Sequence, residues 1–225
     1  MDPIRISCFS DILCVWAYVA QVRLDELKAN FTDGVMLDTH FVSIFGNARQ
    51  KLEARWQDKG GLRAYSAHVR QVASQYPHVV VHPDVWVAGT PTSSLSCHLF
   101  LCAVRVAARE GGLPDAMRAP DPVTWAMRRA FFAELADVSD RSVQFGIAET
   151  CGVPAAPVEA AIRSGAAYAE LSRDLDLARE LNVTVSPTLI FNEGRQRLNG
   201  NVGYRVIDAN LRELLRKPDG EQSWC

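Results

Sequence analysis

The order of predicted strands and helices at the two ends of the chain most constrains its fold. Residues 4–9 alternate apolar and polar side chains, which predicts a strand. Apolar side chains recur at helical spacing from about residue 14 to residue 30, and residues 35–42 are again rich in strand formers. A strand, a helix and a second strand predict a parallel pair joined by a right-handed helical crossover.

The C-terminal part of the chain returns to this mixed character. A strand predicted over residues 183–191 is interrupted by Ser186-Pro187, and proline removes a backbone donor from a sheet. The proline is therefore expected at a sheet edge or a bulge, with a peptide bond that is either cis or trans. Around it the sequence predicts a helix over 168–181, a turn at 192–194, a return strand over 195–199 and a closing helix over 204–215.

The middle of the chain, residues 48–166, has a different character. It is rich in Ala, Arg, Gln and Leu at helical spacing and is punctuated by Gly and Pro, which predicts several helices joined by short loops. Residues 78–81 are the one strand-like run within it. We therefore predict an α/β fold in which residues 1–47 and 167–225 form one discontinuous domain and residues 48–166 form an all-helical insertion.

Charge and composition exclude several classes of partner. The chain of 225 residues has 24 Lys and Arg against 26 Asp and Glu, a net charge of -2, so its overall balance indicates no nucleic-acid or membrane partner. No stretch approaches the ~18 apolar residues of a membrane span, and residues 1–5 lack a signal-peptide pattern. Six cysteines are too few for a disulfide scaffold, so we expect a cytoplasmic protein with reduced thiols.

Cys14 stands where the first predicted strand gives way to the first predicted helix. Backbone N–H groups and the helix dipole stabilise an anion there, so we expect the pKa of this thiol to fall. Trp16 and Tyr18 are candidates for the wall of a substrate groove beside it. The alternative is that Cys14 is a small buried apolar residue at a helix start.

The other cysteines give no metal-binding pattern. No pair of cysteines has the two-residue gap of a zinc knuckle or of a dithiol motif. His98 and Cys102 are four residues apart on a predicted helix, where they could share a face toward a metal ion. Because no second pair of ligands is present, a packed helix face is favoured and no metal site is expected.

Two short motifs stand in order along the chain. The first comprises Ser10, Asp11, Cys14, Trp16 and Tyr18, and the second is Val185-Ser186-Pro187-Thr188. With the order of elements, they resemble the DsbA-like thioredoxin superfamily, whose first motif is S-D-x-x-C-P-W-C-Y. The chain is most similar to the cytoplasmic FrnE-type branch and to its relatives, the 2-hydroxychromene-2-carboxylate isomerases and kappa-class glutathione transferases. The resemblance covers nearly the whole chain and implies a thioredoxin fold with a helical insertion.

Two positions depart from the motif. Val15 stands where the family has proline, and Ala17 stands where it has the second cysteine. A dithiol enzyme attacks with its first thiolate and releases the product with its second. The resemblance therefore implies monothiol chemistry, in which Cys14 forms a mixed disulfide that an external thiol resolves. Cys225 near the chain end could resolve it instead, and an alanine engineered to trap a mixed disulfide would look the same.

The resemblance also implies how a substrate binds. Pro187 is expected to be cis beside Cys14, with Ser186 offering its backbone N–H and C=O to an extended peptide, as in strand addition. Glutathione could use the same edge as a cosubstrate, and no tightly bound cofactor is expected. Its γ-glutamyl end would lie on the loop over residues 200–203, where Asn201 is the candidate, although the acidic residue of the glutathione-binding relatives is missing. The isomerase relatives imply a homodimer.

Three functions are compatible with the sequence. The first is a thiol-disulfide oxidoreductase acting on a peptide or protein through Cys14. The second is a glutathione-dependent isomerase or transferase, against which stands the serine that those relatives commonly have at the position of Cys14. The third is a non-catalytic peptide-binding protein that kept the fold and lost the dithiol.

Overall fold

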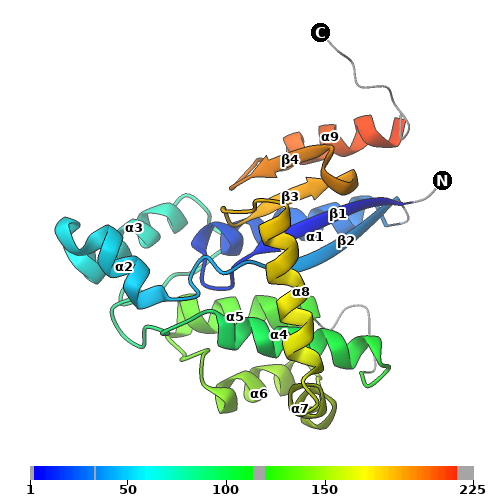
Figure 1. The fold of residues 1–225 in the computed structure, drawn as a ribbon. Coiled ribbons are helices and arrows are strands. Elements are labelled where there is room, and N and C mark those ends of the chain that lie inside the picture. Colours follow the sequence, from blue (N-terminus) through cyan, green and yellow to red (C-terminus); the bar gives the residue numbers. More distant parts are fainter. Residues whose placement is uncertain (1–2, 33, 114–119, 217–225) are drawn as a thin grey trace.

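Four strands form a single mixed sheet in the computed structural model, which describes residues 3–32, 34–113 and 120–216 (Figure 1). Their order across the sheet is β2-β1-β3-β4. β1 and β2 are parallel and are connected by helix α1, so the predicted crossover is confirmed. β3 is antiparallel to both β1 and β4. The bounds are β1 Ile4–Ser10, α1 Val15–Asn30, β2 Val35–Phe41, β3 Thr188–Phe191 and β4 Gln196–Asn199.

Helices make up most of the remaining described chain, as predicted. Six of them follow β2 before the chain returns to the sheet through α8, and α9 closes the fold. Within the described residues, no helix is both long enough and apolar enough to cross a lipid bilayer. The bounds are α2 Ala48–Trp56, α3 Gly61–Ala73, α4 Leu95–Arg109, α5 Pro120–Glu134, α6 Arg141–Thr150, α7 Ala155–Arg163, α8 Ala166–Glu180 and α9 Tyr204–Arg216, with short 3-10 turns η1 Gln57–Lys59 and η2 Asn192–Gly194.

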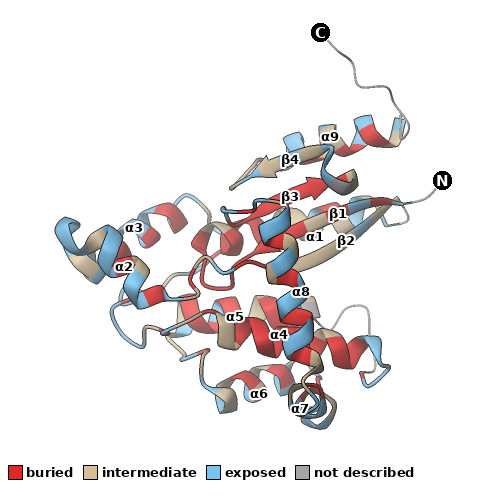
Figure 2. Ribbon diagram, in the orientation of Figure 1, coloured by how far each residue is buried: buried red, intermediate tan, exposed pale blue. Residues whose placement is uncertain are grey.

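The sheet is covered on both faces. One face packs against α1 and α9 through a cluster that includes Ile6, Cys8, Leu27 and Leu211. The other face packs against α8 through a smaller cluster around Phe9. Figure 2 shows the resulting buried layer running along β1 and β3. Successive side chains of β1 therefore point alternately into these two layers, which agrees with the alternating pattern of its sequence.

The largest core joins the start of α1 to the helical block. Leu13, Val15 and Tyr18 belong to the same hydrophobic cluster as the buried faces of α4 and α5. Since Cys14 is a member of this cluster, the chain segment that carries it is fixed by contacts with helices far along the sequence. The N-terminal end of α1 thus lies where the sheet and the helical block meet.

Two strand predictions are wrong. The strand predicted over 183–191 begins only at Thr188, because Pro187 has no N–H to donate and Val183 instead bonds back to the end of α8. Residues 78–81 form no strand, since their polar groups are used elsewhere: the His78 ring lies 3.0 Å from the Val19 carbonyl, and Val80 accepts from the Tyr18 hydroxyl. Val80 itself is 66% exposed, so β-branched residues alone did not recruit it to the sheet.

A buried ion network fastens α8 to α4 and to β2. Asp174 accepts hydrogen bonds from the Phe41 amide at 3.1 Å and from Arg105 Nη2 at 2.8 Å, and its carboxylate lies 2.8 Å from His40 Nδ1. Arg109 bonds both oxygens of Glu170 at 3.2 Å. His40 is therefore a partnered structural group. Burial raises the pKa of both carboxyl groups, but the hydrogen bonds and positive charges around them outweigh it and hold each pKa below its usual value.

This network predicts a loss of stability in acid. The folded-state pKa values of Asp174 and Glu170 are lowered, so their contribution is present above the unfolded pKa values of about 4 and is lost as pH falls through the folded values. We expect the urea midpoint of the wild type to drop between about pH 4 and lower pH, and the drop to be smaller in Asp174→Asn. Asp176→Asn, which removes an exposed carboxylate on the same helix, should keep the wild-type profile.

Candidate active site at the start of α1

Cys14 is the residue that caps the N-terminus of α1. Its backbone N–H donates to the Asp11 carbonyl at 3.1 Å, which closes the turn between β1 and α1. Its thiol donates to the Ser186 carbonyl at 3.2 Å. The sulfur therefore lies between the first amides of a helix and a segment 172 residues further along the chain.

The Ser186-Pro187 peptide bond is cis, as the family resemblance implied. Ser186 Oγ accepts a hydrogen bond from the Asp11 amide at 2.9 Å, so the two sequence motifs are tied together directly. The Pro187 carbonyl accepts from the Gly200 amide at 2.7 Å. These bonds place the cysteine, the proline segment and the loop before α9 side by side.

Asp11 anchors the turn that presents Cys14. The carboxylate is fully buried and accepts three hydrogen bonds, from the Leu13 amide at 2.9 Å, the Phe45 amide at 2.8 Å and Ser94 Oγ at 2.8 Å. His98, equally buried, accepts from the Ile12 amide at 3.2 Å through Nε2. Because its oxygens already hold three donors, Asp11 is a structural acceptor and not a free base.

Asp11→Ala is expected to destabilise the fold by about 4 kcal/mol, because three buried donors lose their acceptor at once. Asp11→Asn, which keeps one carbonyl oxygen, should cost less. Urea unfolding at neutral pH measures both values. Asp176→Ala, the removal of an exposed ion-pairing carboxylate, serves as the control and should change stability by no more than about 0.5 kcal/mol. A loss of that small size in Asp11→Ala would contradict the anchoring role.

The expected lowering of the Cys14 pKa is wrong. The residue is only 7% exposed, and burial raises the pKa of its thiol above the usual value. The nearby amides of Ala17 and Trp16 and the Ser186 side chain act on this pKa in the opposite direction, and the nearby Asp11 charge adds to the rise. The helix start favours the thiolate as predicted, but desolvation is the larger effect in the resting structure.

Three side chains of the helical block lie around this site, and none of them was predicted from the sequence. Arg128 on α5 is 2% exposed and donates to Ser10 Oγ at 3.0 Å and to Gln21. Lys51 on α2 donates to the Ile44 carbonyl at 2.7 Å, and burial lowers its pKa. Burial raises the pKa of Tyr65 on α3, and the charges of Cys14 and Asp11 raise it further.

The other residues of the cysteine motif lie in or near the core. Val15 and Ala17 are buried, and Tyr18 is 1% exposed. The Tyr18 ring packs between Phe132 and Trp125, so Tyr18 forms no wall of an open groove, contrary to prediction. Trp16 is half-buried and packs against the same cluster.

Asn201 lies on the predicted loop, with its side chain already engaged. Its amide donates to the Tyr76 hydroxyl at 2.7 Å, and its carbonyl oxygen accepts from Arg23 of α1. The Arg23 guanidinium also lies over the Tyr76 ring. Asn201 therefore links the loop before α9 to both α1 and the helical block.

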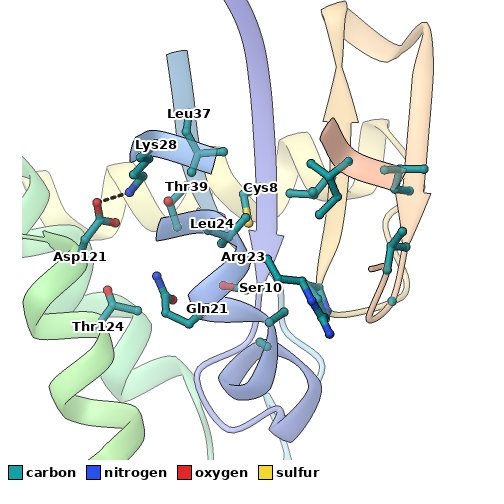
Figure 3. A pocket seen from close by; sticks show the side chains of 18 of the residues that line it. Cys8, Ser10, Gln21, Arg23, Leu24, Lys28, Leu37, Thr39, Asp121 and Thr124 are labelled. Carbon is teal, nitrogen blue, oxygen red and sulfur yellow. Dashed lines mark hydrogen bonds and ion pairs between the residues drawn. The ribbon is translucent and has the colours of Figure 1, made fainter. Parts of the chain in front are cut away.

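A narrow crevice with both polar and apolar walls runs between α1, the sheet and α5 (Figure 3). Ser10, Gln21 and Thr39 line it, and Lys28 pairs with Asp121 across it. Its volume of about 30 Å3 has room for one or two waters and not for a peptide. Pro187 also lines this crevice, as does Ala17, which occupies the position of the second cysteine in the family motif.

Three of the remaining described cysteines are buried, and the fourth, Cys151, is half-buried at the end of α6. Cys8, Cys97 and Cys102 are buried free thiols, and burial raises the pKa of Cys8 to about 11 and that of Cys102 to about 12. No group of three potential metal ligands occurs among the described residues. The suggested resolving residue, Cys225, lies outside the part of the chain that the structure describes.

The mixed sheet, the cysteine at the start of α1 and the cis proline beside it define a thioredoxin-fold protein with a helical insertion. The sequence model of the DSBA-like thioredoxin domain matches residues 5–212. The chain belongs to this family. No curated protein sequence matches it.

Solved structures share the fold across almost the whole chain. A probable DsbA oxidoreductase from Streptomyces coelicolor is 20% identical, with a TM-score of 0.72 over 98% of this chain and 94% of that one. The cytosolic disulfide reductase DsbM from Pseudomonas aeruginosa is 20% identical, with a TM-score of 0.65 over 94% and 98%. A 2-hydroxychromene-2-carboxylate isomerase is 15% identical, with a TM-score of 0.63 over 95% and 97%.

Proposed function

We propose that this chain is a monothiol thiol-disulfide oxidoreductase. The Cys14 thiolate attacks one sulfur of a peptide or glutathione disulfide, the S–S bond breaks, and the other sulfur leaves as a thiolate. An external thiol then attacks the mixed disulfide and releases Cys14. The observation that carries the proposal is the Cys14 sulfur 3.2 Å from the Ser186 carbonyl, at a helix start where Ala17 supplies no second thiol.

Binding of a peptide substrate would also favour ionisation of the Cys14 thiol. In the resting structure the thiol donates to the Ser186 carbonyl, a bond that only the protonated form can make. A peptide that adds as a strand donates its own N–H to that carbonyl and replaces the S–H. The Ala17 and Trp16 amides then favour the thiolate. Ser186 and Pro187 would thus couple binding of the peptide to ionisation of Cys14.

Glutathione is the proposed resolving thiol, acting as a cosubstrate and not as a tightly bound cofactor. The DsbM structure from Pseudomonas aeruginosa has also been solved with GSH. The proposal includes a cytoplasmic setting, where glutathione is reduced, and a homodimer, which light scattering would detect. Isomerase or transferase chemistry is less favoured, because the Asn201 side chain is bonded to Arg23 and Tyr76.

One observation favours a second candidate, a non-catalytic peptide-binding protein on the same fold. Cys14 is buried and its pKa is raised, as expected of a structural thiol. This candidate predicts that peptides bind beside Ser186 while Cys14 stays unreactive. The two functions therefore differ in the reactivity of one sulfur atom.

Alkylation of Cys14 by iodoacetamide as a function of pH separates them, with and without a saturating disulfide-free peptide. For the oxidoreductase we expect an apparent pKa above about 8.5 without peptide and a lower value with it. Oxidised glutathione should then add one glutathione to Cys14, and reduced glutathione should remove it. A thiol that stays unreactive with peptide and forms no mixed disulfide would establish the binding protein instead.

A further inference from the structure

Positive charge is concentrated in one helical hairpin. The basic arm, residues 48–73 (α2, η1 and α3), contains six Lys and Arg and two acidic residues, Glu53 and Asp58, so its net charge is +4. Since the whole chain has a net charge of -2, the rest of the chain carries -6. The basic residues of the arm are Arg49, Lys51, Arg55, Lys59, Arg63 and Arg70.

These cations face solvent without acidic partners. Five of the six are exposed, and Lys51 is half-buried. None forms an ion pair with a carboxylate in the described part of the chain, whereas on the other helices Lys28, Arg105, Arg109 and Arg212 do. An unpaired positive surface on an otherwise negative protein is an electrostatic attractor for an acidic ligand.

The arm packs against the helix that carries the reactive sulfur. In Figure 1 α2 and α3 project beyond the end of the sheet at which α1 begins. Leu52 of α2 and Tyr65 of α3 belong to the same hydrophobic cluster as Cys14, and α3 contacts α1. The basic arm therefore extends from the end of the molecule at which Cys14 lies.

The arm also borders a groove of mixed polarity. Leu62, which is 38% exposed, and Val87 line this cavity of about 440 Å3 between α2, α3 and residues 87–92, together with Arg49 and Glu53. The apolar side chains of an acidic peptide can contact Leu62 and Val87, while the exposed cations of the arm attract its carboxylates. Nucleic acid matches less well, because the Trp56 ring is covered by Tyr65, His68 and Lys59 and is not free to stack on a base.

We propose that the basic arm docks an acidic segment of the protein or peptide whose disulfide reacts with Cys14. The inference rests on the proposed function, because it names the class of substrate for the same thiol. The chemistry is an exchange: the Cys14 thiolate attacks the cysteine sulfur of the peptide, the bond to the leaving sulfur breaks, and a thiolate leaves. The arm increases the rate of encounter and does not take part in bond exchange.

Two peptides of equal length test this, each carrying one cysteine as a 2-thiopyridyl disulfide, one flanked by Asp and Glu and the other by Lys. The rate of 2-thiopyridone release is measured for each peptide, and the rate of the Cys14→Ser protein is subtracted as background. Each corrected rate is then divided by the rate that the same protein shows with the uncharged reagent 2,2′-dithiodipyridine. At an ionic strength of about 0.01 M we expect the acidic peptide to react about tenfold faster than the basic one, and the preference to shrink at about 0.15 M.

Two triple variants with the same change in net charge test whether the preference for the acidic peptide depends on the basic arm. Arg55→Glu with Lys59→Glu and Arg63→Glu should abolish the preference for the acidic peptide. The control, Arg163→Glu with Arg205→Glu and Arg216→Glu, makes the same change in net charge on exposed positions of α7 and α9 and should retain it. Equal rates for the two peptides at low salt would overturn the proposal. So would an equal loss of the preference for the acidic peptide in the two triple variants.

Failure of the proposed function gives a different result. If no reagent releases thiopyridone above the Cys14→Ser background, the thiol chemistry fails, and the arm is tested by fluorescence anisotropy with a labelled acidic peptide that lacks cysteine. Salt-sensitive binding that the arm reversal removes supports the docking surface. Absence of binding, or tighter binding of a single-stranded oligonucleotide than of the acidic peptide at about 0.15 M salt, contradicts it.

Discussion

Replacing Cys14 with serine is expected to abolish mixed-disulfide formation with oxidised glutathione and with peptide disulfides. A serine hydroxyl cannot form a disulfide, and Cys8, Cys97 and Cys102 are buried thiols whose pKa values burial raises. Mass spectrometry of the intact protein after incubation with oxidised glutathione should show the adduct in the wild type and none in Cys14→Ser. Stability should change little, because serine can also donate to the Ser186 carbonyl.

Cys151→Ser is the matched control for this loss. Among the described cysteines Cys151 is the most accessible, and it lies at the end of α6. We expect its replacement to leave the adduct and its rate of formation unchanged. If Cys151→Ser removed the adduct while Cys14→Ser kept it, Cys151 and not Cys14 would be the reactive thiol, and the proposed function would fail.

Ala17→Cys should give the protein a resolving thiol. Residues 14 and 17 are one turn apart at the start of α1, within the separation that a disulfide spans. The thiolate introduced at position 17 would attack Cys14 in the mixed disulfide, expel the peptide as a thiolate and leave a disulfide between positions 14 and 17. Because this step is intramolecular, peptide release without added thiol should be at least about a hundredfold faster than in the wild type.

The position of the new thiol can be tested separately from its presence. Ala20→Cys places a thiol on the same helix, six residues from Cys14 and about 9 Å along the axis, too far to bond to it. Single-turnover release of a labelled peptide in the absence of glutathione should therefore be fast in Ala17→Cys and slow in both Ala20→Cys and the wild type. Fast release in the wild type would mean that another thiol of the chain already resolves Cys14.

Local sequence pattern was sufficient for most of the fold. The alternation in β1, the helical spacing of α1 and the turn before β4 each depend on neighbours within a few residues, and each was predicted correctly. The helix predicted to end at residue 181 ends at Glu180, and Asn182, two residues later, adopts a positive φ of 51°. The two failures have different causes. At residues 78–81 the Val80 carbonyl bonds to Tyr18, far away in the sequence, whereas at 183–187 the Val183 amide bonds back to Ala178 and Pro187 has no N–H.

Some residues of the candidate site were likewise predicted from the sequence, and others were found only in the structure. The cysteine at a helix start and the cis proline were predicted from two motifs. Arg128 was missed, although its spacing from Thr124 and Phe131 places it on the buried face of α5 and could have identified it. Lys51 gives no such signal, because it is tied to the site only through the loop before α2, where the Phe45 amide bonds to Asp11 and the Ile44 carbonyl accepts from Lys51.

The sequence by itself determined the order of elements, the position of Cys14 at the first helix and the missing thiol at Ala17, because these depend on residue identity and short-range spacing. The tertiary structure alone decided the ionisation of that cysteine. The helix dipole is local and favours the thiolate, whereas desolvation comes from Ser186 and from the helical block, which are remote in sequence. The same is true of the basic arm, whose charges are visible in the sequence but whose place beside Cys14 follows only from the fold.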